Sequence, residues 1–196
     1  MRIVLSQFMS LDGVVQAPGG KEEDTDGGFQ HGGWSFRWFD QEAMGAAIDE
    51  ALESTRALLF GRRTWRVMAD AWPGRAGDPF ADRMNELPKY VASRSLSEGD
   101  MEWNSELLPK DDVFGAIRRL REQGSGDMQV MGSASLARQL VENDLVDEYR
   151  LMIEPVILGG GKRIFPEDGS MRALELVSTT TAGTGVQIAV YRPAGG

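Results

Sequence analysis

Short apolar runs alternate with segments of helical periodicity along most of this chain, and this alternation restricts the possible folds more than any other feature. The run RIVLSQFM (2–9) predicts a buried strand, and from Gln41 to Arg56 apolar residues recur at helical spacing with acids on the opposite face. Strands that alternate with helices are typical of a mainly parallel sheet with helices on both faces. We therefore expect an α/β fold of three layers.

The other expected elements complete this pattern. Further strands are expected at 57–60, 89–95, 101–103, 128–132, 146–158 (with a break at Pro155), 173–182 and 185–193. Further helices are expected from 61 to a point before Pro73, in a short segment that ends by Leu87, from 111 or 112 to 121, and at 133–143. The segment Gly183-Thr184-Gly185 joins the last two strands and predicts a C-terminal antiparallel hairpin. Because no repeat or low-complexity linker interrupts the pattern, we expect one domain over 1–196.

The composition excludes several kinds of site. The chain has 196 residues, no cysteine and one histidine, His31. Disulfides, thiolate zinc sites, iron–sulfur clusters and multi-histidine metal sites are therefore excluded within one chain, and we expect no metal. The formal net charge of -9 argues against a general nucleic-acid binder, which needs a basic face.

No segment of the sequence has the pattern of a targeting signal or a membrane span. No apolar run approaches the roughly 20 residues that cross a bilayer, and a strand-like IVLSQFM follows Met1 almost at once. We therefore expect a soluble, cytoplasmic protein that acts on a small molecule. Since the net charge is negative, a phosphate-bearing ligand must be held by a local cluster of cations and backbone N–H groups.

The junction LLF-GRRTW places a glycine between a strand and a helix. Gly61 allows close approach of a ligand to the backbone, and the free N–H groups of Arg62, Arg63 and Thr64 would point at an anion, which the helix dipole also favours. The alternative is an ordinary helix that starts at a glycine and carries two solvated arginines. The junction alone does not decide between the two.

Two further segments have similar chemistry. At VMG-SASL, Gly132 ends a strand, Ser133 can cap the following helix, and small residues leave room for a pyrophosphate. At the strand end ASRS, Ser93 and Arg94 could hold one more phosphate, and an arginine in such a place selects a 2′-phosphorylated dinucleotide. Taken singly, an ordinary helix cap and a solvent-facing arginine are the better interpretations of these two segments.

The order of these segments resembles a known family. LLFGRRTWRVMA, KYVASRSL and MQVMGSASLARQLVENDLVDEYRLMIEPVILGGGKRIF resemble successive segments of dihydrofolate reductases. The start, IVLSQFMSLDGVV, is more similar to the reductase domain of the bifunctional riboflavin-biosynthesis deaminase-reductase. The resemblance extends from Ile3 to about Tyr191 and implies a dihydrofolate reductase-like fold that binds NADPH in extended form.

The resemblance also implies roles for individual residues. The expected cofactor-binding residues are Val15, Gly61, Arg62, Arg63, Thr64, Ser93, Arg94, Gly132, Ser133, Ala134, Ser135 and Leu136. The family's chemistry is hydride transfer from NADPH to a small heterocycle or ribosyl carbonyl, here 5-amino-6-(5-phosphoribosylamino)uracil reductase-like. The zinc deaminase half is absent, so only the reduction is expected. A true dihydrofolate reductase, or a nucleotide-binding protein of the same fold without turnover, are the alternatives.

Other residues have both a catalytic and a structural interpretation. Asp12 would lie near the nicotinamide, but Leu-Asp-Gly is also ordinary turn chemistry. Glu154 interrupts an apolar run, so it is either a catalytic acid in a pocket, a partner of an arginine or an edge residue. The remaining expected substrate-binding residues are Trp34, Trp38 and Gly160. The glycine- and acid-rich segment 17–33 predicts a long loop, and WSFRWF (34–39) suggests a substrate stack, core or dimer contact. Because this aromatic surface is large for a monomer, we expect a homodimer.

Overall fold

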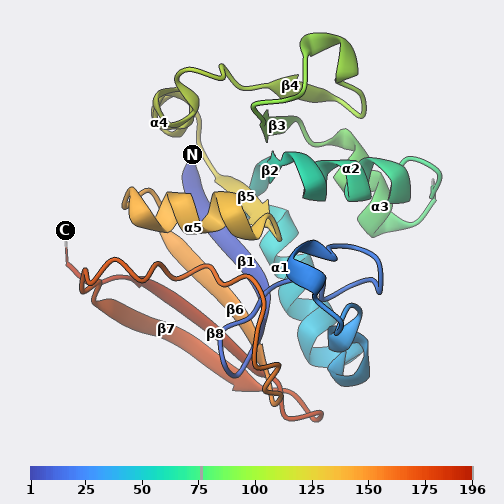
Figure 1. The fold of residues 1–196 in the computed structure, drawn as a ribbon, viewed down its shortest axis with the longest axis vertical. Coiled ribbons are helices and arrows are strands. Elements are labelled where there is room, and N and C mark those ends of the chain that lie inside the picture. Colours follow the sequence, from blue (N-terminus) through green and yellow to red (C-terminus); the bar gives the residue numbers. More distant parts are fainter. Residues whose placement is uncertain (76, 196) are drawn as a thin grey trace.

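Eight strands form one continuous sheet in the structure, a computed structural model that describes residues 1–75 and 77–195 (Figure 1). The strand order is β4-β3-β2-β5-β1-β6-β8-β7. The strands are β1 (Arg2–Ser10), β2 (Thr55–Gly61), β3 (Lys89–Ala92), β4 (Ser105–Leu107), β5 (Asp127–Met131), β6 (Glu148–Glu154), β7 (Leu174–Thr181) and β8 (Gln187–Pro193).

The sheet is parallel over most of its width. From β4 across to β6 every neighbouring pair is parallel, while β8 pairs antiparallel with both β6 and β7. The expected mainly parallel sheet with a C-terminal antiparallel hairpin is therefore confirmed. In a parallel sheet the carboxyl ends of the strands share one edge, which is where α/β proteins bind ligands.

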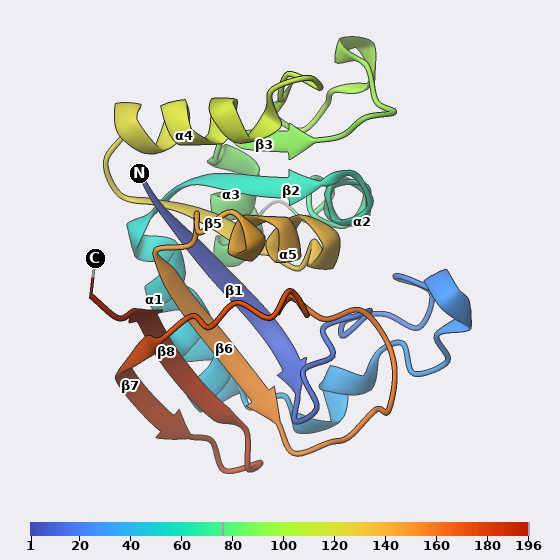
Figure 2. The ribbon, with the colours of Figure 1, turned by 60° about the vertical axis from the view of Figure 1, so that its left-hand side comes forward.

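Helices cover both faces of the sheet (Figure 2). They are α1 (Ala46–Ser54), α2 (Arg62–Ala71), α3 (Pro79–Glu86), α4 (Val113–Gln123) and α5 (Ala134–Glu142). The alternation of side chains along β2 shows the two layers, because Ala57 and Leu59 pack in the core with α4 and α5, whereas Leu58 and Phe60 pack with α2 and α3. This matches the continuous apolar run expected of a strand buried on both faces.

Two expected boundaries are wrong for local reasons. The strand expected at 101–103 is absent, and β4 starts at Ser105 instead, because Trp103 (φ 55°) and Asn104 (φ 52°) adopt left-handed backbone conformations that no strand accepts. The helix expected over 41–56 starts as a π-helical turn at Gln41–Gly45 and ends at Ser54. The backbone at Thr55 is already extended, so β2 begins there, two residues earlier than expected.

Two other strands are shorter than expected. The one expected at 89–95 ends at Ala92, because the hydroxyl of Ser93 accepts hydrogen bonds from the N–H groups of Ser95 and Leu96 and turns the chain. The strand expected at 146–158 runs from Glu148 to Glu154 and stops before Pro155, which has no N–H to donate.

The glycine- and acid-rich loop after β1 is folded against the body of the protein. Gly32 packs so closely that a Cβ there would lie 2.2 Å from the Lys21 carbonyl oxygen, so no larger residue fits without a shift of the loop. Short 3-10 turns occur at Asp26–Gly28 and Trp34–Trp38. In the part of the chain that the structure describes, no helix is long and apolar enough to cross a membrane.

Candidate functional site

A cleft of about 680 Å³ lies at the carboxyl ends of the parallel strands. Its walls come from the residues just after β2, β3 and β5 and from the loop after β1. All twelve residues expected to bind the cofactor line this one cleft: Val15, Gly61, Arg62, Arg63, Thr64, Ser93, Arg94, Gly132, Ser133, Ala134, Ser135 and Leu136. The structure thus brings the expected set together, and its role in binding stays a prediction.

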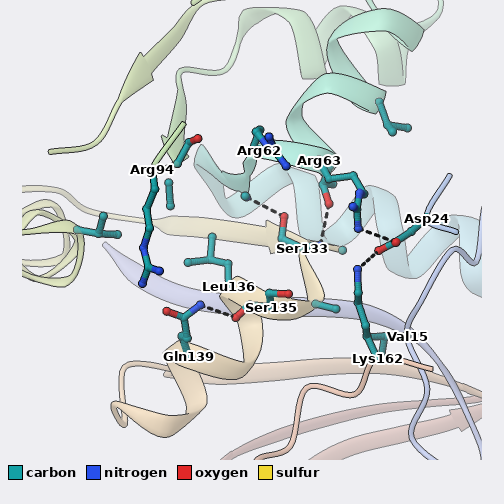
Figure 3. Close-up of a pocket in the computed structure, with 18 of the residues that line it drawn as sticks. Val15, Asp24, Arg62, Arg63, Arg94, Ser133, Ser135, Leu136, Gln139 and Lys162 are labelled. Carbon is teal, nitrogen blue, oxygen red and sulfur yellow. Dashed lines mark hydrogen bonds and ion pairs between the residues drawn. The ribbon is translucent and has the colours of Figure 1, made fainter. Parts of the chain in front are cut away.

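The two glycine turns touch each other in the middle of the cleft (Figure 3). The backbone N–H of Gly61 donates to the Ser133 hydroxyl at 2.9 Å, and the N–H of Ser133 donates to the Thr64 hydroxyl at 2.9 Å. Gly132 has φ +62°, and a Cβ there would lie 3.2 Å from the Thr64 methyl group. The turns after β2 and β5 are therefore one cross-linked unit.

Ser133 differs from the expectation in one respect. It occupies the N-cap position of α5, but its side chain makes no capping hydrogen bond. Its backbone is left-handed, with φ 53° and ψ 47°, and its hydroxyl accepts from Gly61 across the cleft instead. The N-terminal amides of α5 therefore receive no hydrogen bond from this side chain, so they stay available to a ligand.

One group of cations in the cleft forms no salt bridge among the described residues, although Asp111 and Asp112 also line the cleft. Arg94 extends along the wall toward Gln139 (Figure 3), and Lys110 and Arg118 line the same cleft. Arg62 donates to the Ser95 hydroxyl at 3.1 Å. Over residues 1–75 and 77–195, no salt bridge joins Arg62 or Arg94 to a carboxylate. These side chains are free to meet an anion.

A second group of side chains in the cleft forms a cluster of four charges. Arg63 donates to a carboxylate oxygen of Asp24 at 2.6 Å and to both oxygens of Asp26 at 2.6 and 2.7 Å. The Lys162 ammonium reaches Asp24 at 2.6 Å and Asp26 at 2.8 Å. Hydrogen bonds from Arg63 and Lys162 lower the pKa of Asp26. Burial raises the pKa of Asp24, but the hydrogen bonds from Lys162 and Arg63 outweigh burial, so the pKa of Asp24 is lowered as well.

Gln16 holds this cluster in place. Its buried side-chain amide donates to the backbone oxygens of Asp24 (2.9 Å) and Asp26 (3.1 Å) and accepts from the N–H of Lys162 at 3.0 Å. Gln16, Asp24 and Asp26 were not expected as binding residues, and Lys162 was expected only as part of a basic turn (159–163) that could contact a substrate phosphate or be a plain loop. The acidic run in a glycine-rich loop and the lysine after three glycines were visible in the sequence, but their pairing was not.

Asp12 holds a turn and does not line the cleft. It accepts hydrogen bonds from the Ser10 hydroxyl at 2.7 Å and from the N–H groups of Leu158 and Gly159 at 3.1 and 3.0 Å. Burial opposes ionisation, but these three donors outweigh it and lower the pKa of Asp12 to about 2. The structural alternative is thus the one these contacts support, and a catalytic role stays a prediction.

Glu154 is buried at the end of β6, outside the cleft. One oxygen accepts a hydrogen bond from the Ser35 hydroxyl, and the other, Oε2, has no partner among the described residues. Burial raises the pKa of Glu154 to about 7, more than the Ser35 hydrogen bond lowers it. The carboxyl is unusual in its protonation, but it does not line the cleft.

The expected substrate contacts divide into two groups. Gly160 lines a second cavity of about 430 Å³, which shares Gln16, Asp26 and Lys162 with the cleft. Trp34 is buried and donates its indole N–H to the Gln16 carbonyl at 2.8 Å, and Trp38 packs against the small core around Met44. The two tryptophans therefore line neither cavity, because their rings anchor the loop to the protein interior.

The sheet order, the helices on both faces and a cleft at the strand ends define a dihydrofolate reductase-like α/β protein. The chain belongs to the RibD C-terminal domain family, whose model matches residues 2–188. The resemblance expected from the motifs is therefore confirmed at the level of the family.

The chain is also similar to other proteins over nearly its whole length. The uncharacterized Bacillus subtilis proteins YyaP and YwjB are 28% and 30% identical to the chain; both matches cover 97% of it, and 94% and 98% of those proteins. The structure of a protein from Shewanella sp. PV-4 that is described as a riboflavin biosynthesis protein has a TM-score of 0.72 at 17% identity, with 100% of both chains covered. A pyrimidine reductase-like protein from Corynebacterium diphtheriae has a TM-score of 0.67 at 15% identity, covering 100% of this chain and 92% of its own.

Proposed function

We propose that the protein is an NADPH-dependent reductase that transfers a hydride to a small heterocyclic substrate of the ribosylamino-pyrimidine type. One observation carries this proposal. Twelve residues from four separate parts of the chain, each expected to contact the cofactor, line a single cleft at the carboxyl edge of the sheet. Family membership supports a reductase, and a pyrimidine reductase-like protein shares the fold.

The residues of the cleft fit a dinucleotide with several phosphates. Its volume of about 680 Å³ lies within the range of ~300–1,000 Å³ typical of ligand sites. The amide-rich turns at Gly61 and Ser133 lie between the two charged ends, as an extended dinucleotide requires (Figure 3). The cations at the Arg94 end offset the overall negative charge of the chain where a 2′-phosphate would lie.

Each group of residues has a distinct task in this proposal. Bound NADPH supplies the hydride. The N–H groups at the start of α2 and α5 bind the pyrophosphate, and Arg94 with Ser93 binds the 2′-phosphate. The loop after β1, with Val15, covers the nicotinamide end and excludes water from it.

The test is a titration with NADPH and with NADH in which thermal unfolding monitors binding. Absorbance at 340 nm then monitors oxidation of the nucleotide in the presence of candidate acceptors. A ligand at 100 times its Kd stabilises a folded protein by about 2.7 kcal/mol. We expect stabilisation by NADPH at lower concentration than by NADH. The absence of a shift with both nucleotides contradicts the proposal. Binding without oxidation across ribosylamino-pyrimidines, pteridines and quinones would favour the nucleotide-binding alternative without turnover.

A further inference from the structure

Two cations of the cleft are neutralised by acids of the same chain. Arg63 at the start of α2 and Lys162 after β6 each contact both Asp24 and Asp26, which belong to the loop after β1. Figure 3 shows Arg63 and Lys162 converging on Asp24 from opposite sides of the cleft. Two positive and two negative charges balance, so these four side chains offer no net charge to a ligand, and Glu23 adds a further acid to the lining of the cleft.

The geometry around Arg63 is the one that a phosphate group would use. Its guanidinium binds both oxygens of Asp26, and the Lys162 ammonium adds a second donor to the same carboxylate. Such a planar fork recognises carboxylates and phosphates alike. Arg62 and Arg94 lack such partners over residues 1–75 and 77–195, so the neutralisation is specific to one end.

The contact is suited to exchange because it is partly open to water. The side chain of Asp26 is 52% exposed and that of Arg63 is 40% exposed, whereas those of Asp24 and Lys162 are 14% and 27% exposed, so the Arg63–Asp26 pair is the more open contact. Exposed ion pairs contribute little to stability because solvent screens them. A phosphate group carries about as much charge as both acids together and a similar number of acceptor oxygens, and free diphosphate carries more of both, so either can compete with them.

We propose that Arg63 and Lys162 form a phosphate-binding site in the cleft, and that Asp24 and Asp26 occupy this site as an internal anion until a ligand displaces them. The acidic segment 24–26 thereby regulates access of phosphate-bearing ligands to the cleft. The phosphate belongs either to the dinucleotide or to its co-substrate. The inference rests on the proposed function only in naming these two sources.

The first experiment measures the affinity for inorganic pyrophosphate by calorimetry at 0.15 M salt. The double variant D24N/D26N removes the internal charges but keeps oxygens for the Gln16 amide. It should bind pyrophosphate about 10-fold more tightly than the natural chain, a typical coupling between competing contacts. D49N/E50Q makes the same change in net charge on the exposed face of α1 and should leave the Kd within about 2-fold, since salt screens distant charges.

The variants of the cations complete the cycle. Adding R63Q/K162Q to D24N/D26N should abolish the gain in affinity. Equal affinities of D24N/D26N and D49N/E50Q overturn the proposal, as does a gain that survives the loss of Arg63 and Lys162. Failure of every protein to bind pyrophosphate overturns it as well.

A second measurement leaves both acids in place. Because the chain has no cysteine, T25C provides a unique thiol between the two acids for a polarity-sensitive fluorophore. Thr25 is exposed and its side chain makes no capping bond. Saturating pyrophosphate should change the emission, as displacement of the segment requires. Binding seen by calorimetry without a change in emission shows that the acids stay in place and overturns the proposal.

Titration with NADPH separates the two sources of phosphate. If D24N/D26N binds both NADPH and pyrophosphate more tightly than the natural chain by the same factor, the site belongs to the cofactor. If only the affinity for pyrophosphate increases, the site belongs to the co-substrate. If no protein binds NADPH while the pyrophosphate gain persists, the proposed function fails and the anion site stands. If NADPH binds but D24N/D26N shows no gain in affinity for pyrophosphate, the proposal of an internal anion fails and the proposed function stands.

Discussion

The Ser133 hydroxyl accepts a hydrogen bond from the backbone N–H of Gly61 at 2.9 Å and thereby joins the turns that follow β2 and β5. These strands are neighbours in the sheet, although 72 residues separate the two partners along the chain. The bond places a strained serine, with φ 53°, at the centre of the cleft.

Substitution of Ser133 separates the hydrogen bond from the backbone strain. S133A loses the bond and keeps the positive φ, so its free energy of unfolding should fall by about 1 kcal/mol. S133G also loses the bond but tolerates the positive φ, so it should be more stable than S133A by roughly 1 kcal/mol. Urea denaturation of both variants measures the difference. An S133A variant as stable as the natural chain would show that the bond contributes nothing.

Arg94 should determine the preference for NADPH over NADH. A charge-assisted hydrogen bond contributes about 1.5–3 kcal/mol, so R94A should weaken NADPH binding by roughly 10- to 100-fold and leave NADH binding nearly unchanged. R66A is the matched control, because Arg66 is exposed on α2 and does not line the cleft. Kd values by fluorescence titration test this prediction, and an equal loss for both nucleotides would contradict it.

Glu154 should make the stability depend on pH. Its pKa of about 7 in the folded state exceeds the ordinary value of 4.5 because of burial. The protonated carboxyl therefore contributes up to about 3 kcal/mol to the free energy of unfolding. This contribution is complete below pH 4.5 and is lost as the pH rises through 7. E154Q cannot ionise, so the difference in unfolding free energy between it and the natural chain should change over this window. The exposed E50Q should show no such change; a constant difference for E154Q would refute the assignment.

Lys89 should have the opposite effect at higher pH. Its side chain is buried, its ammonium donates to the Asn85 carbonyl at 2.9 Å and lies 4.1 Å from the Trp103 ring centroid. Burial lowers its pKa to about 8 from 10.5, so the unfolded chain binds more protons between these values and stability rises with pH there. K89M should lack this rise. Denaturation between pH 7.5 and 10, with K21M as an exposed control, checks it.

The sequence predicted the positions of most elements because local signals determine them. Apolar runs marked β1 and β2, and helical periodicity marked α1. It failed at Trp103 and Asn104, since a left-handed backbone at non-glycine residues leaves no local signal. It also failed to predict that β3 ends before Ser93. The Ser93 hydroxyl accepts hydrogen bonds from two backbone N–H groups, and nothing in the sequence distinguishes such a serine from one in a longer strand.

The candidate site was predictable in its residues but less so in their partners. The glycines at 61 and 132 and the arginines at 62 and 94 follow strands, and that position alone implied a common edge. The tryptophans at 34 and 38 could not be placed in the same way. Aromatic rings are suited equally to a substrate and to a core, and only the packing around Gln16 and Met44 decided for the interior.

By itself the sequence determined the class of fold and the amide-rich turns that could hold phosphates, because both depend on short-range periodicity and on glycine between strand and helix. Only the tertiary structure decided which charges meet. Lys162 contacts Asp24 and Asp26 across 138 and 136 residues, and Ser133 meets Gly61 across 72. The sheet order places strands distant in the sequence side by side, and ion pairs form between whichever side chains that order brings within reach.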